Sequence, residues 1–459
     1  MNPTIPENRQ WNRTARRIGL GQYPDEIRLK AGTTVTPVDL NAWLHRSDRS
    51  DLTDFPYETV VAEYRCHGKH FVSEEFLDTL AAARETLPDI SQSSPDTMLL
   101  RRFLQVALDK RDGSYDYTSY IALSLLPAPT IDDGPADESN ALPRRDRLVV
   151  QLVADTIQFE LDAAEGQPRY IREDRPDART VDKRIRLATR VAVPALVRLG
   201  LAPDFGLLDP ECAKPDSARA ARLLCAAVLP EMTHRDHLIL QLTMLPVSVS
   251  HDEYLFIRVL QLFEISFAAL TVQLLGAVHA LTLGNGADAA AHLVGAEATL
   301  REAAPMFSLL ATMQVEAFRS FRTATHGASA IQSRNYKILE ALCRRPDQER
   351  LDSAAFTSTP EVRDCVLAGS PTVDDAFESA CAAGRLDPVQ RHEVHQAMRS
   401  FSAALERWRH THYRLAVRMI GDTPGTGYTA GTTYLRSARS IEVFRTINRA
   451  GEGERYEVG

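Results

Sequence analysis

The amino-acid sequence predicts an all-helical protein, and three observations support this fold class. Apolar residues recur with a helical period of about 3.6 in several long segments, and helix start and stop signals bound those segments. One segment, from about residue 250 to residue 284, is a long apolar helix by this test. A single stretch, Tyr115 to Leu126, is compatible with either a helix or a short buried strand. The chain has 459 residues, so we expect two domains or one enlarged helical domain.

The N-terminal half, residues 1–235, is predicted to be mostly helical. Residues 1–50 show no sustained period and predict an irregular lead-in, and the Pro- and Asp-rich residues 127–143 predict a loop. Helices are expected at 73–85 (with Ser73 as N-cap), 95–110, 144–164, 180–201 and 216–229. Cys66, His67 and His70 have no second ligand pair at a matching interval, so a metal site is not predicted there. Packing, oligomerisation or covering a site is the expected role of this half.

The C-terminal half, residues 236–459, forms the second predicted domain. Ser250 and Glu253 have the spacing of a capping box, which predicts the start of a helix that ends at Gly284. A further helix is expected at 288–303, and Pro305 suits the first turn of the next. Residues 265–283 carry no formal charge and are long enough to cross a bilayer, but their polar residues and the charges earlier in the same helix favour a buried core helix.

Composition excludes several classes of function. The net charge of −8 and the lack of a dense basic run argue against a nucleic-acid partner or an anionic membrane surface. The N-terminus lacks the apolar core of a secretion signal. Six scattered cysteines fit a reduced cytoplasm better than a disulfide framework, so a cytoplasmic protein is expected.

The most informative stretch runs from Trp408 to Arg436. Its first part reads as a helix that stops at Gly421, and its second part is a loop rich in Gly and Thr. Consecutive residues step about 100° around a helix, so His410 and His412 point away from each other. His412 lies on an apolar stripe with Trp408, whereas His410 lies among charged residues. By pattern alone, a histidine on an apolar stripe such as His412 is more often a hydrogen-bonded core residue than a metal ligand.

The motifs WRHTH, RMIG, PGTG and YLRS resemble the C-terminal signature of the tryptophan 2,3-dioxygenase family, and HDEYLFI at residue 251 resembles the start of its distal haem-pocket helix. The resemblance covers residues 236–459 and implies the helical-bundle haem pocket of that family. It implies that His412 is the proximal haem ligand and that Thr426 meets the amino-acid end of the substrate. Gly425 and Gly427 flank Thr426 in a turn whose amides suit the ammonium group and the haem propionates. No cysteine follows Cys381, so we expect non-covalent haem b.

The resemblance also implies a substrate clamp around residues 318–329. A gapless count back from Glu340 places the family's carboxylate-binding arginine on Arg322, its aromatic pocket position on Phe318 and the loop serine over the haem on Ser329. Arg319 is a competitor, since a register slip would exchange the two arginines. A planar guanidinium binds both oxygens of a carboxylate, so Arg322 together with Thr426 would specify a free α-amino acid.

The sequence departs from the family at Leu260. The family carries a histidine four residues after the phenylalanine that corresponds to Phe256, and that histidine accepts a hydrogen bond from the indole N–H of tryptophan. Leucine accepts none, so a buried indole N–H would lose about 1–3 kcal/mol. Either the substrate is a methylated indole, a phenol or an aliphatic side chain, or tryptophan binds with a loop residue or water as acceptor.

The predicted function is therefore haem-dependent oxygenation of a free aromatic amino acid by dioxygen or peroxide, by dioxygenation or mono-oxygenation. Alternatives are a haem-dependent hydroxylase of tyrosine or of a non-indole amino acid, a non-catalytic haem-binding sensor, and a helical scaffold whose motifs are relics. A homo-oligomer, dimer or tetramer, is expected from the resemblance.

Overall fold

The computed structural model confirms the all-helical fold class. It describes residues 38–45, 54–90, 94–129, 138–166, 174–202, 217–421, 423–426 and 430–447, and within these ranges it contains helices and no strand. The cysteines in these ranges are all free thiols.

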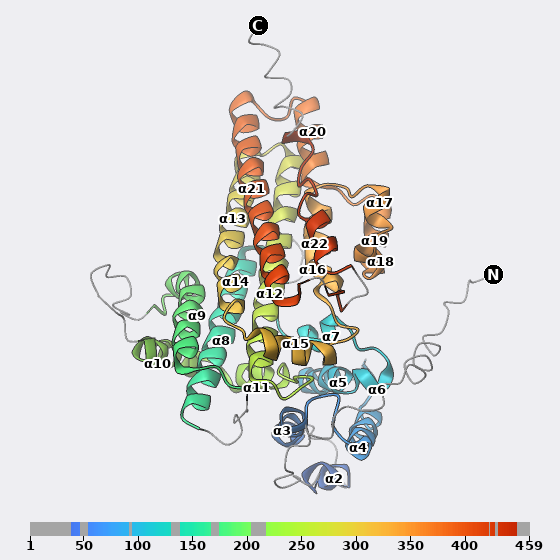
Figure 1. Cartoon of the computed structure of the whole chain (residues 1–459). Helices are drawn as coiled ribbons and strands as arrows, with labels where there is room; N and C mark the ends of the chain where they lie inside the picture. Colours follow the sequence, from blue (N-terminus) through green and yellow to red (C-terminus); the bar gives the residue numbers. More distant parts are fainter. Residues whose placement is uncertain are drawn as a thin grey trace, which may run out of the picture.

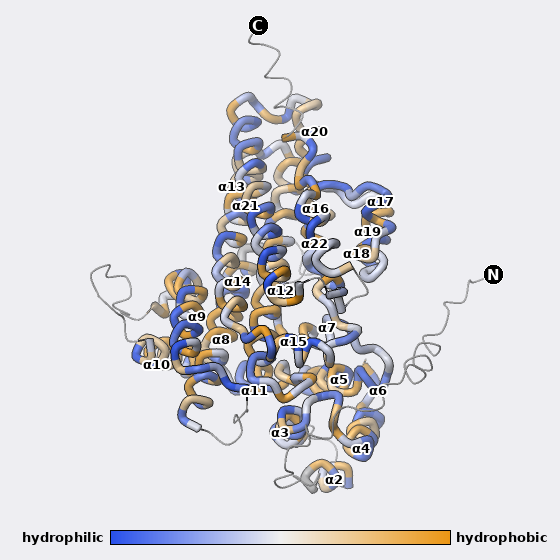
Figure 2. Tube along the Cα trace, viewed as in Figure 1, coloured by the Kyte–Doolittle hydropathy of each residue, from blue (hydrophilic) through white to orange (hydrophobic). Residues whose placement is uncertain are grey.

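Long helices form the centre of the molecule (Figure 1). α12 (His251–Leu283) packs along α13 (Gly286–Ala303), and α13 packs along α21 (Pro388–Ile420). α12 is hydrophobic along most of its length (Figure 2), and nearly all of its side chains are buried. Among the described residues it is the one helix long and apolar enough to cross a membrane, yet most of it is buried inside the protein. This agrees with the predicted core helix.

Helices from the N-terminal half cover one end of this centre. α8 (Glu138–Ala164) packs on α12, and α9 (Ala178–Arg198) packs on α8 and on α14 (Pro305–Leu310). In Figure 1, α8, α9 and α10 lie at the lower left, and α2 to α6 lie at the lower right. The remaining helices of this half are α2 (Val38–Leu44), α3 (Tyr57–His67), α4 (Glu74–Glu85), α5 (Pro95–Ala107), α6 (Asp109–Asp112), α7 (Tyr117–Tyr120), η3 (Leu123–Leu125), α10 (Ser217–Val228) and η7 (Leu229–Glu231).

Short helices of the C-terminal half complete the fold. α16 (Arg334–Cys343) and α20 (Val373–Ala382) pack on α12, and α22 (Thr432–Ala438) packs on α21. The others are α11 (His234–Leu242), α15 (Val315–Ala324), η8 (Ala330–Gln332), α17 (Gln348–Leu351), α18 (Ala354–Thr357) and α19 (Pro360–Leu367). The main buried cluster runs from Leu40 to Phe444 and draws on both sides of residue 235, so the division into domains 1–235 and 236–459 stays a prediction.

Several local predictions are confirmed. Ser73 caps α4 by accepting from the N–H of Phe76, and Pro305 lies in the first turn of α14. The ambiguous stretch from Tyr115 to Leu126 is helical, as α7 and η3. The predicted loop over 127–143 ends earlier, because α8 begins at Glu138 and contains Pro143. Pro143 is the sixth residue of α8, beyond the first turn, so it removes one intrahelical N–H donor, a loss that the helix tolerates.

The predicted capping box at the start of α12 is wrong in its hydrogen bonds. Ser250 is the N-cap residue, but its hydroxyl donates to Asp174 instead of closing the local box. Glu253 accepts from the backbone N–H groups of Val247, at 2.7 Å, and Ser248, at 2.9 Å. A distant residue therefore takes the Ser250 hydroxyl, and the segment just before the helix takes the Glu253 carboxylate, so the helix begins where it was predicted for a different reason.

Candidate functional site

His412 lies near the end of α21, one turn after Trp408. Its ring stacks on Phe307 of α14 at 5.9 Å between ring centroids and lies 5.4 Å from the ring of Trp408. Neither ring nitrogen hydrogen-bonds with any residue in the described ranges. The ring is half-buried, and burial lowers the pKa of His412 to about 4, so the imidazole is neutral near pH 7. A neutral, unengaged imidazole is the form that binds a metal ion.

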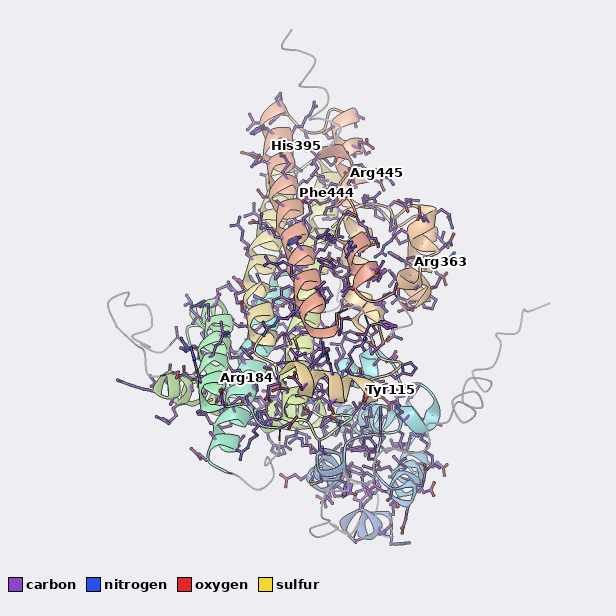
Figure 3. All side chains as sticks on the ribbon, in the orientation of Figure 1. Tyr115, Arg184, Arg363, His395, Phe444 and Arg445 are labelled. Carbon is purple, nitrogen blue, oxygen red and sulfur yellow. The ribbon has the colours of Figure 1, made fainter. Side chains whose placement is uncertain are left out.

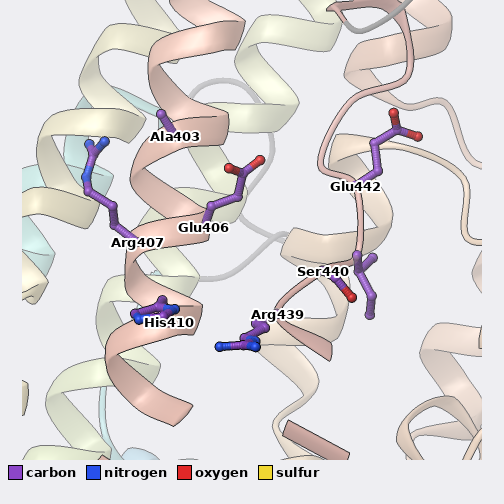
Figure 4. A pocket seen from close by; sticks show the side chains of 8 residues that line it. Ala403, Glu406, Arg407, His410, Arg439, Ser440 and Glu442 are labelled. Carbon is purple, nitrogen blue, oxygen red and sulfur yellow. The ribbon is translucent and has the colours of Figure 1, made fainter. Parts of the chain in front are cut away.

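His410 lies on the opposite, exposed face of α21, as the helical period predicts. It lines an open groove of about 830 Å³ between α21 and the segment that follows α22 (Figure 4). The groove also contains Glu406, Arg407, Arg439 and Glu442, so its walls carry charges of both signs. This polar groove faces away from His412 and does not provide an apolar ligand pocket.

The wall contributed by α12 is apolar. The ring of Phe256 lies 5.5 Å from Phe318 and 5.4 Å from Phe321, both on α15. Leu260, one turn further along α12, is 9% exposed and belongs to a buried cluster with Tyr117, Tyr120 and Ala328. The structure thus brings Phe256, Leu260 and Phe318 together.

Tyr117 and Tyr120 of α7, which the sequence analysis did not select, complete this wall. Their polar ends are tied to buried acids of α12: the hydroxyl of Tyr120 donates to Glu253 at 3.3 Å, and that of Tyr117 hydrogen-bonds Glu264. In the sequence, the close spacing of the tyrosines along one short segment was the feature that could have indicated a role for them. The placement of this segment against α12 depends on tertiary packing, which a local pattern does not determine.

Arg322, on α15, reaches the loop that precedes α22. Its guanidinium donates to the carbonyl oxygen of Pro424, and it has no carboxylate partner among the described residues. The side chain is half-buried, and burial lowers the pKa of Arg322 from its ordinary value. Arg319 is exposed and donates to the carbonyl of Met419 at 3.3 Å. Of the two candidate arginines, Arg322 is the one beside the Gly425–Thr426 turn.

Residues 424–426 lie close to the end of α15. The carbonyl of Thr426 accepts from the N–H of Gly327 at 3.4 Å, which joins the turn to the loop that carries Ser329. Gly431 has φ +60°, and a side chain there would collide with the carbonyl oxygen of Thr423, so this position requires glycine. Gly427, the third predicted member of the turn, lies outside the described residues.

The HDE motif at the start of α12 holds the fold together. His251 Nε2 bonds with Glu160 at 3.0 Å, and Arg184 pairs with both Glu160, at 2.9 Å, and Asp252. Asp252 also accepts from the N–H of Gln314 at 2.6 Å. In the view of Figure 3, Arg184 lies to the left of α15 and Tyr115 to its right. The motif therefore ties α8 and α9 to α12, and nothing in the local pattern pointed to Arg184.

The residues around His412 fit the haem group that the resemblance implies. The ring is neutral and unengaged, and Phe307 and Trp408 give it an apolar environment suited to a porphyrin face. The indole N–H of Trp408 is buried without a hydrogen-bond partner in the described part of the chain. Buried donors are almost always paired in native proteins, so this donor calls for an acceptor from a bound group or water.

Comparison with curated proteins finds relatives that match a little under half of the chain. Tryptophan 2,3-dioxygenases from Anaeromyxobacter sp. (strain K) and from Anaeromyxobacter dehalogenans are each 32% identical, over 228 and 230 residues, and each match spans 43% of this chain and 86% of the relative. The tryptophan 2,3-dioxygenase of Caulobacter vibrioides is 28% identical over 232 residues, which span 43% of this chain and 88% of the relative. No protein-family model matches the chain.

Proposed function

The chain belongs to the tryptophan 2,3-dioxygenase family, and from that premise we propose that it is a haem-dependent oxygenase of a free aromatic amino acid, namely tryptophan or a substituted tryptophan. The observation that carries the substrate class is Arg322. It is a half-buried arginine without a carboxylate partner in the described ranges, and it lies against the Gly425–Thr426 turn. A guanidinium in this position, bonded to a backbone carbonyl but to no carboxylate of the described residues, is suited to the carboxylate of a ligand.

His412 would hold the haem iron, and Gly425 and Gly427 would place backbone amides near the charged edge of the group. When bound, haem supplies the activation of dioxygen or peroxide. Phe307 and Trp408 fix the orientation of the His412 ring through aromatic packing. The partly buried surroundings keep that imidazole unprotonated near pH 7, so its lone pair remains available.

The amino-acid end of the substrate would be held by two groups from different segments. Arg322 offers a planar donor pair to the carboxylate, and the hydroxyl of Thr426 would orient the ammonium group. Because both groups lie at one edge of the apolar wall, they would direct the side chain of the substrate toward Phe256, Leu260 and Phe318. Holding the reacting ring in one orientation is the main contribution that the protein makes to such a reaction. Ser329 would cover the site from the adjoining loop.

Leu260 bears on the choice of side chain. Leucine accepts no hydrogen bond, and its neighbours Tyr117 and Tyr120 already donate their hydroxyl hydrogens to Glu264 and Glu253, so only phenol oxygens of this wall could accept from an indole N–H. An indole methylated on nitrogen avoids the penalty of about 1–3 kcal/mol for an unpaired buried N–H. The second candidate is a hydroxylase of tyrosine or of a non-indole amino acid, and the apolar wall favours those side chains that carry no hydrogen-bond donor.

The test uses purified protein reconstituted with haem. It is incubated with tryptophan, 1-methyltryptophan or tyrosine and an oxidant, either dioxygen with a reductant or peroxide, and the products are measured by mass spectrometry. A gain of two oxygen atoms identifies dioxygenation, and a gain of one identifies hydroxylation. Full haem loading without turnover of any amino acid would contradict the proposal and favour a haem-binding sensor.

The clamp has its own matched pair of variants. Arg322→Gln is expected to raise KM for the amino acid by about 30-fold, because removal of a charge-assisted hydrogen bond costs about 2 kcal/mol. Arg319→Gln, on the exposed face of the same helix, should change KM by less than about twofold. Equal effects of the two variants, or a larger effect at Arg319, would show that the clamp is assigned to the wrong arginine.

The cellular setting is part of the same proposal: a cytoplasmic homo-oligomer, for which size-exclusion chromatography with light scattering gives the subunit number. A monomer that retains full turnover would contradict the oligomeric part alone.

A further inference from the structure

Gln332 joins two distant segments beside the candidate site. Its side-chain oxygen accepts from the backbone N–H of Ser329 at 3.0 Å and from that of Tyr117 at 3.1 Å, although Gln332 and Tyr117 are 215 positions apart in the chain. Ser329 is the loop serine of the proposed site. Tyr117 belongs to the wall that contains Leu260. One amide oxygen therefore connects the two.

Both N–H groups need an external acceptor because of where they lie. Tyr117 is the first residue of α7, and Ser329 is the N-cap residue of η8. The first N–H groups of a helix have no acceptor within the helix, so a side chain or water must satisfy them. Gln332 does this for two helix starts at once, which fixes the distance between them.

The opposite end of the same segment is held separately. The side-chain amide of Gln261, on α12, donates to the carbonyl of Ile121 at 2.8 Å. The tyrosine segment (residues 115–121) is therefore fastened to α12 at its end and to the Ser329 loop near its start. Gly327 lies beside the ring of Tyr115, so the segment and the loop also touch directly.

From this geometry we infer that Gln332 is a positioning residue: it sets the width of the side-chain pocket by holding the Ser329 loop against the tyrosine segment. It has no assigned contact with substrate and acts through Ser329 and Tyr117. The inference rests on the proposed function for its effect on the substrate, but the connection between the two segments is measurable without turnover.

The test compares three variants as haem-loaded full-length protein. Gln332→Met has a similar size but no acceptor, and Gln332→Glu retains acceptor oxygens. Gln390→Met is the matched control, because the Gln390 side chain accepts from the N–H of Asp387 at 3.2 Å at the start of α21. Gln332→Met should raise KM for the aromatic amino acid by about tenfold with kcat changed by less than about threefold, while Gln332→Glu stays within about twofold of wild type.

Hydrogen–deuterium exchange provides the readout that does not need a substrate. In Gln332→Met, exchange should rise in the peptides that contain Tyr117 and Ser329 together, with the Soret band of the bound haem unchanged. A variant with a wild-type KM, or with faster exchange in only one of the two peptides, would overturn the inference, and so would a Gln332→Glu variant as impaired as Gln332→Met. If wild-type protein oxidises no amino acid, the proposed function fails, while the exchange data still decide whether Gln332 joins the segments.

Discussion

Two regions of the molecule centre on a histidine of a long helix, and they differ in how their polar groups are used. At the start of α12, each side chain of the HDE motif has a partner: His251 bonds with Glu160, Asp252 with Arg184, and Glu253 with two backbone N–H groups. At the end of α21, His412 has no hydrogen bond within the described ranges. The nearby Trp408 N–H also lacks a partner among the residues that the structure describes.

The presence or absence of a hydrogen-bond partner within the chain distinguishes polar groups that stabilise the fold from polar groups that are suited to a ligand. Burying an unpaired donor or charge costs free energy, so native proteins pair such groups unless a ligand completes them. In the HDE region every side chain is paired within the described residues and only the Nδ1 of His251 is left without a partner, so this region mainly stabilises the fold. The His412 region, with Arg322 close by and without a carboxylate partner among the described residues, has groups suited to a ligand. Removing a side chain from the first region should destabilise the protein, and removing one from the second should cost binding.

The largest expected effect is at His412. His412→Ala should lose the Soret band of axially ligated haem, because the proposed iron ligand is absent. His410→Ala, two residues earlier on the exposed face of α21, should retain the spectrum of the wild type. Both variants should melt close to wild-type apoprotein, since neither histidine has a buried polar partner in the described part of the chain. A His412→Ala protein that binds haem fully and has the wild-type spectrum would show that His412 is not the iron ligand, and the proposed difference between the two regions would be wrong.

The sequence predicted the helices of both regions better than their tertiary roles. Local signals located the start of α4 at Ser73 and the end of α12 at Gly284 because capping and left-handed glycines act within one turn. The pairing of Arg184 with Asp252 joins segments 68 positions apart, and a local pattern carries no information about it. The same limit explains why the capping box at Ser250 was wrong.

The candidate site shows the same division. Periodicity placed His412 on the inner face of its helix, but its role as a ligand came from the family resemblance and stays a prediction. Leu260 was identified from its spacing after Phe256, and the structure adds that Tyr117 and Tyr120 lie against it. Those tyrosines belong to the N-terminal half, for which the sequence predicted no chemistry.

The next largest effect is expected at the centre of the HDE region. Arg184→Met leaves the carboxylates of Glu160 and Asp252 buried without their cation, and breaking a buried pair costs about 3–5 kcal/mol. Arg186→Met, two residues later, removes an exposed pair with Asp182 and should cost less than about 0.5 kcal/mol. Urea denaturation of the two variants measures this. Similar midpoints for both would mean that the buried network does not stabilise the fold.

Glu264 lies further along α12 and hydrogen-bonds Tyr117 of the apolar wall. Burial raises the pKa of Glu264 to about 7, although hydrogen bonds from Ser333, Tyr117 and Asn335 oppose the shift. Its folded-state pKa is thus above the unfolded value, so the fold is unaffected below about pH 4.5 and loses stability as the pH rises from there to about 7. Glu264→Gln, which stays neutral, should be more stable than wild type by up to roughly 3 kcal/mol at pH 8 and equal near pH 4.

Melting temperatures at pH 5 and pH 8 measure the Glu264 effect. A constant difference between the variant and the wild type across this range would mean that the carboxyl does not titrate there. In that case Glu264 would keep one protonation state from pH 5 to pH 8, and the predicted pH dependence would be wrong.

The smallest effect is expected at Leu260, where the apolar wall meets the proposed ligand. Leu260→His introduces an acceptor that an indole N–H needs, so the preference for tryptophan over 1-methyltryptophan, measured as the ratio of kcat/KM values, should rise about tenfold, equivalent to about 1.4 kcal/mol. Leu260→Met keeps the volume without an acceptor and should leave the ratio unchanged. The same rise in both variants would attribute the preference to packing, and no rise in either would place the indole N–H away from α12.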